Sequence, residues 1–243
     1  MVFNDFLRKI ISNKPKCPYC YKELPKFPLR KSKCPYCKEV IFIKRRPSSK
    51  RKILVTKEEA EKIEKEWEEV YFRERLRDDF GWVGFSEKDY YRARRILKRK
   101  FGTTPSHSDI YWYISNLFLE KAAKKKDLEA MRQIYFRQAL FLHEEGKDCF
   151  LALQMSRKCE LLQYQQQGIK KVRISTTGDR ACENCKLLEG KVFSIEEALE
   201  KMPLPVKNCL HKLNPDAPTG WCRCLYEPVL ENEELFKEFW KNS

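Results

Sequence analysis

The sequence predicts an α+β protein with an N-terminal zinc ribbon, a helical middle of about five helices and a small, β-rich, cysteine-rich zinc module at the C-terminus. Three observations lead to this prediction. The pentapeptide Lys-Cys-Pro-Tyr-Cys occurs twice near the N-terminus, at 16–20 and 33–37. Apolar residues recur at helical spacing over 57–168, and several of these runs follow a Ser or Thr that can cap a helix. Five more cysteines lie between 182 and 224.

Composition and charge exclude several classes of protein. Of the 243 residues, 35% are charged and 13% are aromatic, and no run of ~18 apolar residues predicts a membrane-spanning helix. Residues 1–14 lack the apolar stretch of a signal peptide. Collagen-like, mucin-like and membrane classes are therefore excluded. Cysteines of proteins that are not secreted stay reduced. We therefore interpret the paired Cys-x-x-Cys motifs as metal ligands rather than as disulfides.

The first two Cys-x-x-Cys pairs predict a four-thiolate zinc site in a ribbon of residues 1–46. Thirteen residues separate the pairs, and each pair is expected to turn so that both sulfurs face one metal ion. A core of about 40 residues is too small to fold unaided, so the metal is expected to stabilise it. A rubredoxin-like iron site uses similar knuckles, but zinc is the preferred interpretation. A short strand over 39–44 is expected to complete the ribbon. The predicted ligands are Cys17, Cys20, Cys34 and Cys37.

Most of the net charge lies in this N-terminal region. Residues 1–55 carry 16 Lys or Arg and three acidic residues, which leaves only +2 of the total +15 for the rest of the chain. Such an excess suits a polyanion or an acidic protein face. We interpret residues 47–56 as an exposed basic linker; the alternative is an arm that contacts phosphates. The candidate nucleic-acid contacts are Lys31, Lys33, Lys44, Arg45, Arg46, Arg51 and Lys52.

Residues 57–168 predict a helical domain. Capping residues and glycine stops place helices over about 57–79, from Ser86 to Gly102, from about Pro105, over 127–145 and over 147–167. The last two helices form a hairpin without a repeat partner. The Trp and Tyr residues of the helical domain lie at core spacing and are interpreted as core rather than as base-stacking groups. Cys149 and Cys159 are expected to be core thiols, and His107 and His143 to lie at caps or on the surface.

Residues 169–243 predict a second zinc module that ends in a helix. We expect a strand at 172–175, a knuckle at 182–185, a hairpin over 187–195 and a short helix capped by Ser194. Cys182 and Cys185 are expected to bind zinc with two or more of the later cysteines, and His211 is a substitute ligand. Cys222 and Cys224 can share one metal only if the chain turns there. The candidate ligands are Cys182, Cys185, Cys209, Cys222 and Cys224.

This segment also resembles a known family. The sequence Thr-Gly-Asp-Arg-Ala-Cys-Glu-Asn-Cys at 177–185, Leu-Glu-Gly at 188–190, the prolines at 203 and 205, and Cys-Arg-Cys at 222–224 resemble the C-terminal signature of the Mu-F-like phage head-morphogenesis proteins. The resemblance covers residues 172–228. In that family a His lies close to Cys-Arg-Cys, whereas His211 lies eleven residues before Cys222 and Cys209 intervenes, which favours Cys209 as a ligand.

The resemblance implies a minor virion or procapsid component that acts with portal and capsid proteins during DNA packaging, in a virion or the host cytoplasm. The leading hypothesis is therefore a phage or prophage assembly protein with two structural Zn²⁺ ions, and with DNA as a further partner but no membrane or small-molecule substrate. The alternative is a regulatory protein that binds nucleic acid through the zinc ribbon and is not part of a virion. An enzyme is not expected, because no phosphate loop, dinucleotide turn, His-Glu-x-x-His or His-x-Glu motif occurs.

Overall fold

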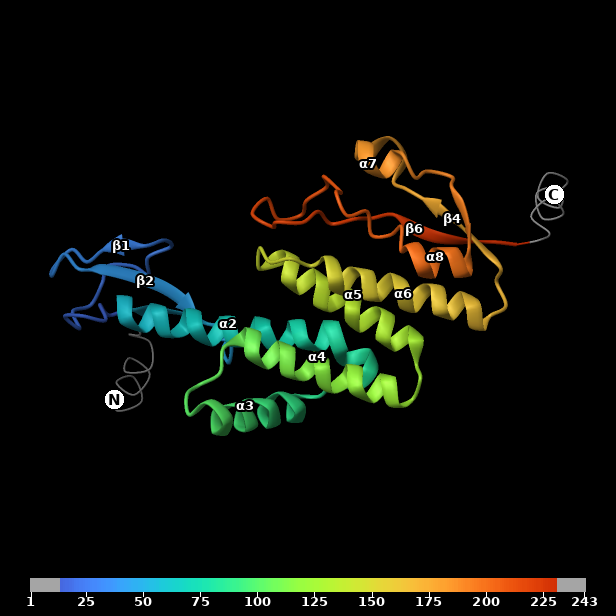
Figure 1. Ribbon diagram of the computed structural model, residues 1–243. Coiled ribbons are helices and arrows are strands. Elements are labelled where there is room, and N and C mark those ends of the chain that lie inside the picture. The colour runs from blue at the N-terminus through green and yellow to red at the C-terminus, as the bar shows by residue number, and fades with distance from the viewer. Residues whose placement is uncertain (1–13, 231–243) are drawn as a thin grey trace, which may run out of the picture. The chain divides into compact units, whose positions relative to one another are not determined.

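The computed structural model describes residues 14–230, and the chain divides into two compact units, residues 1–75 and 76–243 (Figure 1). The predicted C-terminal helix falls after residue 230 and therefore lies outside the described residues. The class is α+β, with two small three-stranded sheets and a set of helices between them in the sequence. In the described part of the chain, no helix combines the length and apolarity that a membrane crossing requires.

The first unit is built on a three-stranded antiparallel sheet. Strands β1 (Ser32–Lys33), β2 (Val40–Arg45) and β3 (Lys52–Val55) follow one another in order, with Ile41 opposite Ser32 and Phe42 opposite Val55. Helix α2 (Lys57–Phe80) begins directly after β3. Apolar side chains of the sheet and the first turns of α2 form a small core. The strand predicted over 39–44 corresponds to β2.

The prediction of a basic linker over 47–56 is wrong in its second half. Residues 52–55 form β3, which pairs with the whole basic end of β2. Ile53, Leu54 and Val55 are apolar and mostly β-branched, so they gain by pairing and packing against α2 rather than remaining in solvent. The basic run is thus a hairpin, and only residues 46–51 connect its two strands.

Helices of the second unit lie where the sequence predicts them. They are α3 (Glu87–Phe101), α4 (His107–Lys124), α5 (Leu128–Glu144) and α6 (Phe150–Gln166). Capping boxes at Ser86 and Ser106 begin the first two, because each serine and the acid three residues later satisfy each other's free N–H groups. Tyr111 stacks on Phe141 with ring centroids 3.8 Å apart. However, Tyr71, Trp82 and Tyr91 are 60%, 44% and 53% exposed, so not every aromatic at core spacing is core.

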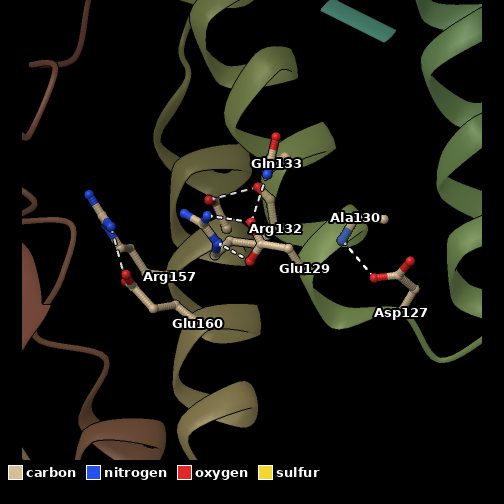
Figure 2. Close-up of polar contacts among 8 residues, drawn as sticks. Asp127, Glu129, Ala130, Arg132, Gln133, Arg157 and Glu160 are labelled. Carbon is tan, nitrogen blue, oxygen red and sulfur yellow. Dashed lines mark hydrogen bonds and ion pairs between the residues drawn. The ribbon is translucent and has the colours of Figure 1, made fainter. Parts of the chain in front are cut away.

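A polar network stabilises the hairpin of α5 and α6 (Figure 2). Glu129 accepts hydrogen bonds from Arg132 and Gln133, and Arg132 holds the pKa of that carboxyl at about 2. On α6, Arg157 lies 3.0 Å from Glu160, and both side chains are almost fully buried. Removing one partner of such a pair would leave a buried charge uncompensated. The two helices are joined by the Ser156 hydroxyl of α6, which donates to the Arg132 carbonyl of α5 at 2.9 Å, and the cysteine-rich module packs on this helix pair.

The cysteine-rich module is the second sheet with its connections. Strand β4 (Lys171–Ser175) lies between β5 (Val192–Ser194) and β6 (Leu225–Val229), both antiparallel to it. Short helices α7 (Glu183–Lys186) and α8 (Ile195–Lys201) lie in the connections, and Ser194 caps α8 as predicted. The predicted hairpin over 187–195 is wrong. Its second half pairs instead with β4, because Val172 and Ile174 offer a buried apolar strand.

Candidate metal centres

The four N-terminal cysteines form one compact sulfur cluster in the first unit. All four Sγ atoms lie within 4.8 Å of one another, with 3.7 Å between Cys17 and Cys37 and 3.8 Å between Cys20 and Cys34. A zinc ion with Zn–S bonds of about 2.3 Å in tetrahedral geometry requires sulfurs about 3.8 Å apart. The distances are far longer than a disulfide bond of about 2.05 Å. The set therefore has the dimensions of a closed metal site.

The two knuckles have the same backbone because they share a sequence. In each, the residue after the second cysteine, Tyr21 or Lys38, has a positive φ, 58° and 64° respectively. The amide of that residue donates to the carbonyl of the first cysteine, Cys17 or Cys34, at 3.0 Å. This turn brings the two sulfurs of each pair to the same side. The tyrosines differ: the Tyr19 hydroxyl accepts the Lys57 N–H at 3.0 Å, at the first residue of α2, whereas Tyr36 is half exposed.

The sulfurs interact strongly as ionisable groups. Burial opposes ionisation of Cys34, but the N–H groups of Cys37 and Tyr36 outweigh it and lower the pKa of Cys34 to about 6. The Glu39 N–H favours the thiolate of Cys37, yet burial and the other sulfurs raise the pKa of Cys37 to about 12. One thiolate thus forms easily and the next does not. A cation among the four would relieve that repulsion, since metal binding requires and stabilises the thiolates.

Five cysteines of the C-terminal module form a second cluster. Cys182, Cys185 and Cys209 make one close group, and Cys185, Cys222 and Cys224 make another. The Cys209 sulfur lies 3.9 Å from that of Cys182 and 3.7 Å from that of Cys185. Cys185 belongs to both groups and so occupies the middle of the cluster. A tetrahedral ion takes four of these five thiols.

Three separate segments supply the five sulfurs: the 182–185 knuckle at α7, the 203–209 loop and residues 221–224, which directly precede β6. The sulfurs of Cys222 and Cys224 lie within 4.8 Å of each other, as the sharing of one metal requires. The backbone at residue 220 lies very close to that of Cys209, and only glycine fits there. A Cβ at this position would lie 1.9 Å from the Cys209 carbonyl oxygen. The spacing of the cysteines does not predict this role of Gly220.

Backbone amides further distinguish two of the five sulfurs. Cys222 accepts a hydrogen bond from the Val206 N–H at 3.3 Å, and Cys182 accepts one from the Leu210 N–H at 3.5 Å. The neighbouring thiols of Cys209 and Cys224 hold the pKa of Cys222 far below its usual range. Hydrogen bonds of this kind stabilise thiolates and orient metal ligands.

Neither close group of sulfurs includes His211, the predicted substitute ligand. The backbone carbonyl of His211 accepts the Trp221 N–H at 2.7 Å. The ring Nε2 of His211 is buried and has no hydrogen-bond partner among the described residues. Cys209, rather than His211, joins Cys182 and Cys185 in the first close group.

His143 lies in the last turn of α5, at the predicted cap region, but it is fully buried, so the prediction of a surface position is wrong. Its Nε2 accepts the N–H groups of Leu213 and Asn214 at 3.0 and 3.1 Å, and its Nδ1 lies 3.7 Å from the sulfur of Cys149. The ring therefore fixes the loop between Cys209 and Cys222. Since Nε2 accepts both bonds, the proton of the neutral ring lies on Nδ1.

Acidification is expected to loosen this loop. Burial, followed by the charges of Lys212 and His211, lowers the pKa of His143. A lowered pKa means that the neutral ring stabilises the fold fully above about pH 6.5, and that this contribution is lost as pH falls below that value. We expect His143→Gln to cost about 1–3 kcal/mol and to flatten the dependence of the melting temperature on pH between 7.5 and 5.5.

Hydrogen exchange of residues 211–220 should rise in the same His143→Gln variant. The control is His107→Gln, at the first residue of α4. If both variants show the same melting curves and the same pH dependence, His143 does not hold the loop.

The candidate nucleic-acid contacts fall into two groups. Lys44 forms an ion pair with Glu64, and Arg46 lies 2.9 Å from Glu66, so helix α2 already neutralises these two. Arg45, Arg51, Lys52 and Lys33 are exposed, and Lys31 lies over the Phe42 ring at 4.7 Å. An open groove of about 990 Å³ lies between the sheet and α2. Its walls include Lys31, Arg45, Lys52, Trp67 and Tyr71, together with the carboxylates Glu64 and Glu68 of α2.

No protein-family model matches the chain, and no curated protein or solved structure matches it either.

Proposed function

We propose that this protein is a non-enzymatic assembly component of a phage or prophage head, stabilised by two structural zinc ions. The observation that carries the proposal is the five-thiol cluster, which lies inside the segment resembling the Mu-F-like head-morphogenesis proteins. There the knuckle, the proline loop and Cys-Arg-Cys come together around Cys185. The motifs that carry the resemblance are separate in sequence but belong to one structural module.

The chemistry of both clusters supports a structural role for the metal. A catalytic zinc keeps one position for water or substrate, whereas structural sites are closed by thiolates. The first cluster supplies four sulfurs and the second supplies five, which is enough for protein ligands to occupy all four positions of a tetrahedral ion. Four of the five sulfurs in the second cluster are buried, which removes them further from substrate. Zinc in such sites contributes free energy of folding rather than reactivity.

The test is co-purification with particles from cells that carry the gene. Full-length protein with a small epitope tag should sediment with capsids or procapsids in a density gradient. A Cys185→Ser variant should leave those fractions, while Cys159→Ala, which changes a buried thiol outside both clusters, should remain. Wild-type protein that stays in the light fractions while capsids assemble normally would contradict the assembly role.

A nucleic-acid-binding regulator is the second candidate, and the groove of the first unit favours it. Lys31, Arg45 and Lys52 line this groove beside Trp67 and Tyr71, whose rings stack with centroids 5.3 Å apart. Cationic and aromatic walls suit the backbone and bases of a single strand. Arg45→Gln with Lys52→Gln should weaken binding of a fluorescent 20-nucleotide single strand. Unchanged affinity and salt dependence would remove this candidate without affecting the particle experiment.

A further inference from the structure

Helix α3 concentrates positive charge in a part of the chain that is almost neutral as a whole. Its 15 residues, EKDYYRARRILKRKF, include seven Lys or Arg and two acidic residues. Both acids lie in the first turn, and Asp89 closes the capping box with Ser86. Residues 90–101 therefore contain cations and no acid. The acidic residues that balance them lie elsewhere, with ten in α2 alone, so the average charge of residues 56–243 conceals this segment.

The helix separates its apolar and basic residues onto different faces. Tyr90, Ala93 and Leu97 are buried, at the i, i+3 and i+7 spacing of a helix that packs on its own unit. Arg92, Arg95, Lys98 and Arg99 are exposed. The buried face fixes the orientation of the helix, and the basic face is consequently presented to solvent.

The basic face borders a hollow of about 510 Å³ at the end of the helix. Its lining is Tyr91, Arg94, Arg95, Lys98, Arg99 and Gly102, which includes four cationic groups and no carboxylate. Within residues 14–230, Arg95, Lys98 and Arg99 form no ion pair. These three like charges repel one another, so an anionic ligand would lower the energy of this surface.

We propose that this basic face of α3 binds the phosphate backbone of double-stranded DNA. The exposed cations from Arg92 to Arg99 extend over about 10 Å of helix, the length over which duplex DNA presents about six phosphate charges. Three of them are arginines, whose planar fork matches phosphate oxygens better than an ammonium does. The face offers no set of Asn, Gln or Ser for base edges, so the binding is sequence-independent.

This surface belongs to the second unit and needs no residue of the ribbon. It therefore differs from the sequence-based candidates, all of which lie at 31–52. It also goes beyond the assembly function proposed above, which does not itself require DNA contact.

The test is fluorescence anisotropy of full-length, zinc-loaded protein with a labelled 20-base-pair duplex at several salt concentrations. The variant is Arg95→Gln, Lys98→Gln and Arg99→Gln together. The matched control is Lys124→Gln, Lys125→Gln and Lys126→Gln, which removes the same charge from exposed positions at the end of another helix of this unit. The α3 variant should bind about tenfold more weakly or worse, and its log–log salt slope should fall by about 0.9 for each lost phosphate contact.

The control should change affinity less than about twofold, because its charges lie away from the proposed contact. Equal weakening in both variants would mean that only net charge matters, and unchanged binding in the α3 variant would also overturn the proposal. Arg95→Lys with Arg99→Lys keeps the charge and should retain most binding, which separates loss of contact from loss of fold. Stronger binding of polyglutamate than of DNA would assign the surface to an acidic protein instead.

Discussion

Serine in place of Cys17 and Cys34 is expected to unfold residues 14–55 and to leave the helices of the second unit intact. Each substitution removes one ligand from a different knuckle, and both cysteines are fully buried. The core around them holds little else: Leu24 and Ile41 are its other buried apolar side chains. So few apolar contacts cannot hold a segment of this size, and binding of structural zinc in small domains supplies an apparent ~10–16 kcal/mol at pH 7.

Three measurements check this expectation. Bound zinc should fall by one ion per chain, limited proteolysis should cut within residues 14–55, and far-UV circular dichroism should retain its helical signal. The control is Cys159→Ala, since Cys159 is a buried thiol of α6 that belongs to neither cluster. Protection of the N-terminal segment in the double variant would show that the ribbon folds without its metal.

The sequence predicted most of the local structure because the signals were local. Helix ends were marked by Ser86 and Ser106 at the starts and by Gly102 at one end, and such caps act within one turn. The N-terminal cluster was equally predictable, since each Cys-x-x-Cys is a complete turn and two of them suffice to surround an ion.

Long-range pairings were harder to predict. The charged run that ends at Lys52 predicts a linker at the position of strand β3, and only the partner strand β2 shows why Ile53 to Val55 are extended. Residues 192–194 pair with β4 rather than within their own loop, for the same reason. Strand pairing depends on which partner strand the rest of the chain provides, and the β-propensity of a segment contains no information about that partner.

Two residues of the candidate site also have roles that depend on distant partners. Gly220 looks like an ordinary turn residue until the Cys209 carbonyl approaches it. His143 has no metal-ligand spacing, yet its ring accepts two amides that lie 70 and 71 residues further along the chain. A glycine before Trp-Cys-Arg-Cys was the available signal for the first, whereas nothing local distinguishes the second.

Serine substitutions in the second cluster should differ sharply from one another, because five thiols compete for four positions. Cys185→Ser is expected to release the metal and to destabilise residues 171–229, since this sulfur belongs to both close groups. Cys209→Ser should have nearly the same effect, because Cys209 lies within 3.9 Å of two other sulfurs. In each case the loss should be several kcal/mol of unfolding free energy, as for a structural metal.

Cys224→Ser should instead keep one bound zinc. The amides of Leu210 and Val206 donate to the sulfurs of Cys182 and Cys222, which favours these two as thiolate ligands. With Cys185 and Cys209 they make four, and the sulfur of Cys224 is left as the surplus thiol. Zinc content by mass spectrometry of the native protein, with melting temperature for each variant, distinguishes the sets. Loss of zinc in Cys224→Ser with retention in Cys222→Ser would exchange their roles, and loss in all five would mean that the site needs every sulfur.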